Sequence, residues 1–395
     1  MALHSWSMFS RDSSYAPSKA LRIDTIKILR KHLDVDTGVF TTPFTPDAWE
    51  AVAPGGGMLA YRDGVQQFSG PITARQLNWD AAQGRALITL ECLGDDTHLA
   101  DRLVFPDPLR AADDQTVNDY WSYTGAASTA MWQLISDQAG PTCAASRQVP
   151  GLAMGTNPGV GVSRAWQTLF DAAGPHGVLD ELAAISVSSG ADLGVRITSN
   201  AGQLTVSIVQ PRDLTAAVRF SADLRNLVGL FYREQAPTVT HALSAGQGDL
   251  HARLRKLVTT SDPLATRWGR QIWSYIDRRD TADAPTLAQA SQDGLDQGAQ
   301  TVSLTCTLTD TQVATYGRDW DLGDRVTAYV GLPAQTKVAT VADVVRQISL
   351  TVDNTGKELI QPAVGSYDAK AIIPTPTQQQ LADAGAALRG LISRK

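Results

Sequence analysis

The sequence predicts a mainly β protein with an α+β insertion, because two stretches alternate apolar and polar residues with a period of two. In residues 301–308 four apolar side chains share one face of the expected strand: Val302, Leu304, Cys306 and Leu308. Residues 85–93 alternate in the same way. No helical period is visible between Thr301 and Val352, and turn-forming residues separate the segments. An antiparallel barrel or sandwich is the architecture that this pattern favours.

The chain opens with a polar segment, residues 1–20, which we interpret as a flexible or extended arm. Trp6 and Phe9 are its large anchors, and they dock either on a neighbouring subunit or back on the parent domain. The N-terminus lacks a basic start followed by a long apolar stretch. We therefore expect no signal peptide, no membrane insertion and synthesis in a cytoplasm.

Residues 21–109 are predicted to form the first β block. Asp63-Gly64 stands between two expected strands and is the preferred pair for a two-residue hairpin turn. Residues 97–102 are long enough for one helical turn, and Pro106 and Pro108 close the block.

Residues 110–235 change character and are expected to form a small α+β insertion domain. Apolar stripes at helical spacing, such as Trp166, Leu169 and Phe170, predict its helices. The three helices are placed at 128–140, 163–173 and 178–186. Two strands are expected to follow, at 193–197 and 204–208.

The remainder of the chain divides into three parts. Residues 236–299 are interpreted as a connector that completes the barrels, with a short helix at 285–294. Residues 300–373 form the second β block, and residues 374–395 are predicted to form a C-terminal helix. Its apolar stripe consists of Leu381, Ala384, Leu388 and Leu391.

The composition is that of an ordinary globular protein, with 395 residues and a net charge of −6, enough for two or three domains. No basic run is present that would neutralise phosphates, so sequence-specific binding of nucleic acid is not expected. A mildly acidic surface would instead repel passing DNA. The three cysteines and the scattered histidines lack metal-ligand spacing, so we expect no disulfide, no structural metal and no cofactor.

Candidate catalytic groups are few. Asp95-Asp96 could hold a cation, but a turn that exposes two carboxylates to solvent is the better interpretation, and His241 and His251 are interpreted as isolated surface histidines. A glycosidase uses a pair of carboxylates, and three candidates for such a pair could be imagined: Glu181, Glu234 and Asp249. A chain with 40 acidic residues offers many such sets, so no catalytic, cofactor-binding or metal-binding residue is assigned and the chain is not expected to be an enzyme.

Two groups of aromatic residues could bind a ligand. The segment Arg267–Tyr275 interleaves arginines and aromatics, as binders of single-stranded nucleic acid do, but a packed strand or helix with charged edges is preferred in an acidic chain. The other group could form a sugar-binding platform or equally part of a core: Trp121, Tyr123 and Trp132.

The order of several short motifs resembles a known family. These motifs are Gly38-Val-Phe40, Phe68-Ser-Gly70 with Ile72, Leu93-Gly-Asp-Asp96 with Leu99 and Arg102, Phe220-Ser221 with Asn226-Leu227, Arg267-Trp268 with Tyr275-Ile-Asp277, Trp320-Asp-Leu-Gly-Asp-Arg-Val326, and Pro362-Ala-Val-Gly365. Together they run from about residue 20 to about residue 370. In this order they resemble the hub, or minor tail, proteins of siphophages that infect actinobacteria, a family similar in fold to the central hubs of contractile-phage baseplates.

The resemblance implies a structural virion protein at the tail tip. It implies two tail-tube-like β-barrel domains per chain, so that a homotrimer continues the hexameric tail tube around a channel for DNA. The implied partners are other copies of the chain, the distal tail protein or tail tube, the tape-measure protein and tail fibre or spike proteins. It further implies synthesis in the host cytoplasm. The alternatives are a tail-associated cell-wall hydrolase and a protein that binds host-surface carbohydrate.

Overall fold

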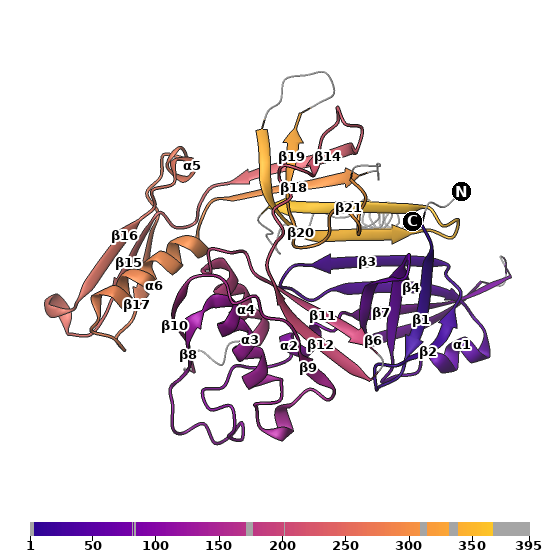
Figure 1. Cartoon of the computed structure of the whole chain (residues 1–395), viewed down its shortest axis with the longest axis horizontal. Coiled ribbons are helices and arrows are strands. Elements are labelled where there is room, and N and C mark those ends of the chain that lie inside the picture. The colour runs from indigo at the N-terminus through magenta and orange to yellow at the C-terminus, as the bar shows by residue number, and fades with distance from the viewer. Residues whose placement is uncertain are drawn as a thin grey trace, which may run out of the picture.

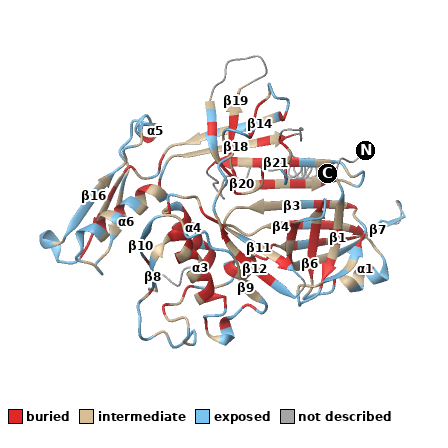
Figure 2. Ribbon diagram, in the orientation of Figure 1, coloured by how far each residue is buried: buried red, intermediate tan, exposed pale blue. Residues whose placement is uncertain are grey.

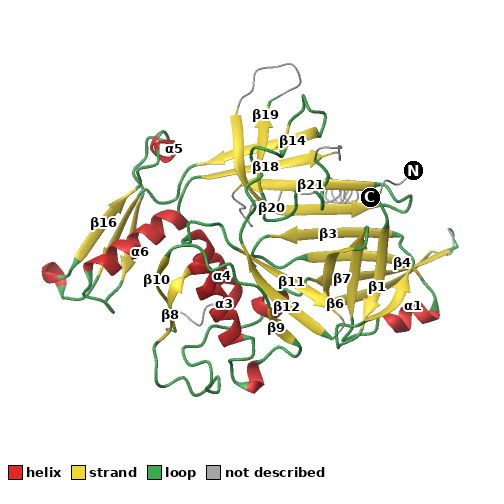
Figure 3. Cartoon of the chain, in the orientation of Figure 1, coloured by secondary structure: helices red, strands yellow, loops and turns green. Residues whose placement is uncertain are grey.

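The computed structural model describes residues 4–80, 82, 84–170, 177–200, 202–308, 314–331 and 339–365. Within these residues strands far outnumber helices, and most of the strands join one large sheet (Figures 1 and 3). The prediction of a mainly β fold with few helices is therefore confirmed. None of the helices in the described part of the chain is both long and apolar enough to cross a membrane.

The large sheet has thirteen strands. Its main path runs through β14 (Leu227–Gln235), β18 (Thr301–Leu308), β21 (Glu358–Gly365), β20 (Ala339–Val352), β3 (Thr25–Lys31), β4 (Thr37–Pro43), β7 (Arg85–Leu93), β6 (Val65–Asp80), β5 (Gly57–Arg62), β1 (Trp6–Arg11) and β2 (Pro17–Leu21). β19 (Arg325–Val330) pairs with β20 and with the short β13 (Arg219–Phe220). Among the described residues no strand pairing closes either block on itself, so closure of each block into a barrel stays a prediction.

The two β blocks are joined edge to edge by β3 and β20. These strands pair antiparallel, from Gln347 opposite Lys31 to Val352 opposite Ile26. Buried apolar side chains from both blocks form one core, which includes Phe40, Phe68, Phe220 and Trp320. Figure 2 shows this buried layer running along the strands of both blocks. A continuous core makes the two blocks one folding unit, because neither can lose its partner without exposing apolar surface.

In the described part of residues 1–20 the segment is not flexible, and of the two alternatives for its anchors the structure supports docking on the parent domain. β1 pairs with β5 along its whole length and also with β2. Met8 is buried, and so is Arg11, whose guanidinium contacts Asp95. The sequence pattern is weak here because the strand has polar residues on both sides, and its partner lies about fifty residues further along the chain.

The α+β insertion packs against one end of the large sheet around a second core. It contains α2 (Thr97–Ala100), β8 (Tyr120–Ala126), α3 (Ala127–Gln138), η1 (Ala145–Arg147), β9 (Leu152–Met154), β10 (Ser163–Leu169), α4 (Val178–Val187), β11 (Gly194–Asn200) and β12 (Gln203–Val209). The predicted helices at 128–140 and 178–186 and both predicted strands are therefore confirmed. The end of the segment assigned to this domain, from β13 to β14, pairs with the large sheet instead.

The predicted helix at 163–173 is wrong over its described residues, which form β10 paired antiparallel with β8. Trp166 and Thr168 are buried while their neighbours are not, so burial follows the period of a strand. The spacing of Trp166, Leu169 and Phe170 also fits a helix, and a segment this short does not distinguish the two periods.

Residues 236–299 form a separate unit instead of completing the barrels. β15 (His241–Ala245) stands between β16 (Arg255–Thr259) and β17 (Trp273–Asp277), and α6 (Ala284–Gln297) covers one face of this sheet. Two short helical segments complete the unit, η2 (Leu250–Ala252) and α5 (Pro263–Thr266). The unit projects from the body at the left of Figure 1. A further helix, α1 (Pro46–Ala51), lies beside β2, and the helix predicted at 374–395 lies outside the described residues.

Candidate functional site

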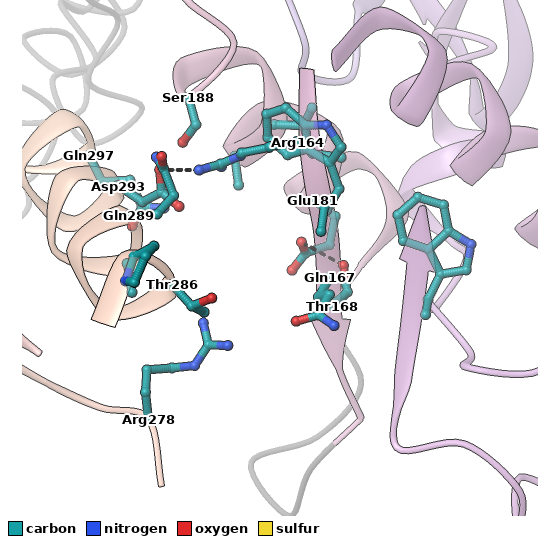
Figure 4. Close-up of a pocket in the computed structure, with 17 residues that line it drawn as sticks. Arg164, Gln167, Thr168, Glu181, Ser188, Arg278, Thr286, Gln289, Asp293 and Gln297 are labelled. Carbon is teal, nitrogen blue, oxygen red and sulfur yellow. Dashed lines mark hydrogen bonds and ion pairs between the residues drawn. The ribbon is translucent and has the colours of Figure 1, made fainter. Parts of the chain in front are cut away.

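A hollow lies between the α+β insertion and the 236–299 unit. It has a volume of about 510 Å³, and β10 and α4 form one wall while α6 forms the other (Figure 4). The lining is mostly polar, with Arg164, Gln167, Thr168, Glu181, Arg278, Gln289 and Asp293 among its residues. Clefts between domains are common binding sites, so this is the candidate site that geometry alone selects.

One ion pair bridges the cleft. The Arg164 guanidinium of β10 contacts the Asp293 carboxylate of α6 at 3.0 Å, and Arg164 also lies over the Trp166 ring at 4.0 Å from the ring centre. Gln289 donates to the same carboxylate at 2.9 Å. Both charged groups are only partly exposed, so the pair links the two units more firmly than a surface pair would.

The other charged groups in the cleft are also engaged. Thr168 donates its hydroxyl proton to Glu181 at 3.1 Å, and Arg278 pairs with Asp280 at 2.8 Å. The hydrogen bonds from Arg278 hold the pKa of Asp280 below its ordinary value. These contacts suit a cleft that positions two structural units more than a site with an activated acid or base.

Arg164→Ala is expected to loosen the 236–299 unit. The change removes the ion pair and the stacking on Trp166, which together contribute about 1 kcal/mol for partly exposed groups. Hydrogen exchange of the α6 amides should become faster, while exchange in β3 and β4 should not change. Lys19→Ala, which removes an exposed pair with Asp47, is the matched control, and equal exchange rates in both variants would contradict the linking role.

The three carboxylates considered as a glycosidase pair occupy different elements. Glu181 lies on α4 in the cleft, Glu234 lies on β14 and is bonded to Tyr232 and Arg267, and Asp249 precedes η2. No described contact brings any two of them together. Among the described residues there is also no group of three His, Cys, Asp or Glu side chains that could hold a metal.

Asp95 and Asp96 do not form a turn that exposes both carboxylates to solvent. Asp95 is buried and forms a two-point ion pair with Arg11, whose Nη2 lies 2.5 Å from Asp95 Oδ1. Asp96 lines a hollow of about 60 Å³ together with Asp36. Burial raises the pKa of Asp36 to about 6, and burial and the charge of Asp36 raise the pKa of Asp96 well above its ordinary value.

Asp96→Asn is expected to stabilise the protein most at alkaline pH. A carboxyl whose pKa is raised by folding binds its proton more tightly in the folded state, so its contribution to stability falls as pH rises from about 4 through the folded pKa. The asparagine side chain does not ionise, so the variant avoids the loss of stability that ionisation of Asp96 causes at high pH. Chemical unfolding should show a gain of at least about 1 kcal/mol near pH 8 and a smaller gain near pH 5.

The control for this pH dependence is Glu50→Gln, which changes an exposed carboxyl and should leave the unfolding free energy unchanged at both pH values. A gain for Asp96→Asn that is the same at both pH values, or a loss near pH 8, would contradict a raised pKa of Asp96 in the folded protein.

The remaining sequence candidates are dispersed. Trp121 is buried and donates to Asp137, and Trp132 donates to the Gly155 carbonyl, so both act within the core and do not form an exposed platform. The segment Arg267–Tyr275 follows α5 and ends in β17, so its end is a strand, but Trp268, Trp273 and Tyr275 are exposed and the expected packing of its aromatics is wrong. The cleft itself was missed, because Arg164 and Asp293 stand 129 positions apart and no local pattern connects them.

The fold is shared with phage tail proteins of known structure. The chain is similar to the 43 kDa tail protein of prophage MuSo2 from Shewanella oneidensis, with a TM-score of 0.56 and 14% identity over 91% of this chain and 98% of that one. It is similar to the tail protein from Neisseria meningitidis MC58, with a TM-score of 0.56 and 14% identity over 92% of this chain and 97% of that one. Prophage tail protein gp18 from Listeria monocytogenes EGD-e has a TM-score of 0.53 and 12% identity over 95% and 98%.

These identities establish a common fold and no more. A comparison with curated protein sequences gives no match. The model of the siphovirus ReqiPepy6 Gp37-like protein family, in contrast, matches residues 24–366. That span contains all the short motifs on which the resemblance to siphophage proteins was based, and it confirms the resemblance. By this match the chain belongs to the siphovirus ReqiPepy6 Gp37-like family.

Proposed function

We propose that the protein is a structural component of a phage tail and forms a homotrimeric hub at the distal end. In this proposal the hub continues the tail tube, encloses a channel through which DNA passes, and anchors tail-tip or receptor-binding proteins. The family match and the tail-protein fold support a place in the tail.

The observation that carries the hub proposal is the joining of two β blocks within one chain. The pairing of β3 with β20 places an N-terminal and a C-terminal block side by side in a single sheet. Three such chains would present six blocks, which is the number needed to match a tube with six subunits per ring. Closed rings are the common form of homo-oligomers, because every contact surface is then used.

Surface features are consistent with contacts to other tail proteins. The hairpin of β6 and β7 extends beyond the sheet, and Leu77 and Trp79 are exposed on it. Exposed aromatic side chains of this kind often anchor interfaces. The acidic net charge would let DNA pass through the channel without adhering to its wall.

Cryo-electron microscopy of intact tails tests the proposal. The expected density is a ring of three copies at the distal end, with the distal tail protein or tail tube on one side and fibre or spike proteins on the other. A different copy number at the tip, or a location in the tail shaft or the capsid, would refute it.

The enzymatic alternative has a direct assay. We propose that the chain acts through shape and contact, so the purified protein should release no fragments from peptidoglycan and should not bind cell-wall polysaccharide. Turnover that is lost on Glu181→Gln would instead support a tail-associated hydrolase in the cleft.

A further inference from the structure

The 236–299 unit leaves one face of its sheet uncovered. Ser244 of β15 points to α6, where its hydroxyl donates to the Leu287 carbonyl at 2.6 Å. Because strand side chains alternate, His241 and Leu243 lie on the opposite face with their cross-strand neighbours, Leu257 on β16 and Trp273 and Tyr275 on β17. Trp273 is 57% exposed and Tyr275 is 56% exposed, so apolar surface faces solvent here.

This surface, which we call the aromatic face (His241, Leu243, Arg255, Leu257, Trp273 and Tyr275), is held by contacts among its side chains and with Arg253. The His241 ring stacks on Trp273 with 4.6 Å between ring centres. Arg253 donates to the Tyr275 hydroxyl at 2.6 Å and to the Ala245 carbonyl at 2.9 Å. Side chains held in place before binding lose little entropy when a partner covers them.

The aromatic face is also basic. Residues 241–279 contain seven Lys and Arg residues and only three Asp, in a chain whose net charge is −6. Arg255 and Arg279 are exposed at its rim. Asp277 lies at the same rim and pairs with Arg253 and with Arg279, so the rim carries three arginines and one carboxylate and keeps a positive charge. An apolar centre with a positive rim fits a protein surface that has an apolar centre and a negative rim.

The same chain carries a surface of that description. The segment 101–119, which we call the acidic loop, has five Asp residues and two Arg. Leu109 is 79% exposed and Val117 is 62% exposed, and Asp113 and Asp119 are exposed beside them. The loop has no helix or strand of its own, yet Gln115 bonds the backbone of Asp107 at 2.8 Å and of Ala111 at 2.9 Å. Further bonds tie it to the body, since Pro108 accepts from Arg147 and from the Ala144 amide.

We propose that the aromatic face of one copy binds the acidic loop of the next copy. Within one chain the aromatic face is turned away from α6, the side on which the cleft and the insertion lie, so its contact with an acidic loop has to come from another molecule. A contact between two different surfaces of identical chains closes into a ring when the rotation between copies closes. The proposal rests on the proposed ring assembly and assigns part of the contact between its copies.

Charge reversal on the purified full-length protein tests this contact. Mass measurement in solution over a wide concentration range should show assembly of the wild type that weakens at high salt. Arg255→Glu with Arg279→Glu, and separately Asp113→Lys with Asp119→Lys, should each raise the dissociation constant about tenfold or more. An equimolar mixture of the two reversed proteins should assemble better than either alone. Both contacts between unlike copies then pair opposite charges, Glu with Lys in one and Arg with Asp in the other, whereas every contact between like copies is repulsive.

Glu50→Lys on α1 is the matched control, at an exposed carboxylate outside both surfaces, and it should assemble like the wild type. Trp273→Ala should weaken assembly without lowering the unfolding free energy by more than about 1 kcal/mol, since the ring is exposed. A wild type that stays monomeric at every concentration, or charge reversals that leave assembly unchanged, would overturn the proposal.

Two results separate this contact from the proposed function. If trimers are found at the tail tip but the aromatic face of one copy does not touch the acidic loop of the next, the proposed contact is refuted and the hub function is unaffected. Assembly that depends on both surfaces, in a protein located in the capsid, would refute the hub function and leave the contact standing. Loss of incorporation into tails after reversal of the aromatic face, with self-assembly intact, would show that an acidic tail protein and not a second copy occupies the face.

Discussion

Arg62→Ala is expected to lower the free energy of unfolding by about 3–5 kcal/mol, because it breaks a buried ion pair and leaves one partner uncompensated. Arg62 lies on β5 of the first block and contacts Glu358 on β21 of the second block at 2.8 Å. The two side chains are only 4% and 13% exposed. Arg62 also donates to the Tyr316 carbonyl at 2.7 Å, and Trp6 donates to Glu358 at 2.7 Å.

The measurement is chemical unfolding of Arg62→Ala, Glu358→Ala and the double variant. The double variant should cost less than the sum of the single changes, since removal of both charges leaves no buried charge without its counter-ion. Arg318→Ala is the control, because its pair with Asp319 is exposed and should be worth less than about 1 kcal/mol. A loss for Arg62→Ala as small as that of the control would show that the blocks are not joined through this pair.

The sequence predicted the local elements of the β blocks well, because their signals are local. Asp63 and Gly64 both have positive φ, at 51° and 79°, as the two-residue hairpin turn requires. The alternation in 301–308 matches a strand whose Leu304, Cys306 and Leu308 are buried. The burial of Cys92 and Cys306 follows from the same pattern.

What the sequence did not predict depends on partners distant in the chain. Arg11 and Arg62 are charged residues that a pattern search places at the surface, but each is buried against a carboxylate that comes much later in the chain. The 236–299 unit looked like a connector, because its sheet has one covered and one exposed face and its apolar signal is correspondingly weak. The cleft forms only where β10 and α6 face each other, and these elements are brought together by the tertiary fold and not by any local sequence pattern.

Gly70 lies where β6 passes from β5 to β7. From Val65 to Pro71 β6 pairs with β5, and from Ile72 onward it pairs with β7. A Cβ at Gly70 would lie 1.8 Å from the Leu93 carbonyl oxygen and 2.8 Å from the Gly94 Cα. Both neighbours are backbone atoms, so no side chain can rotate away to make room.

Two of the motifs that resemble siphophage hub proteins meet at this crossing. Ser69 precedes Gly70, and its carbonyl accepts from the Asp95 amide at 2.9 Å. Asp95 in turn holds Arg11 of β1. A shift of the backbone at Gly70 would therefore disturb the β6 bend and the buried ion pair together.

Gly70→Ala is expected to cost about 3 kcal/mol or more, at the upper end of what overpacking in a core costs. Gly64→Ala is the matched control in the same strand pair, because its φ is +79° with no atom within 4 Å of the added Cβ. That change should cost only the backbone strain of about 1–2 kcal/mol. Thermal or chemical unfolding of the two variants decides between them. An equal cost for both would mean that the strands can separate at Gly70, and that the sheet does not depend on close backbone contact at the bend.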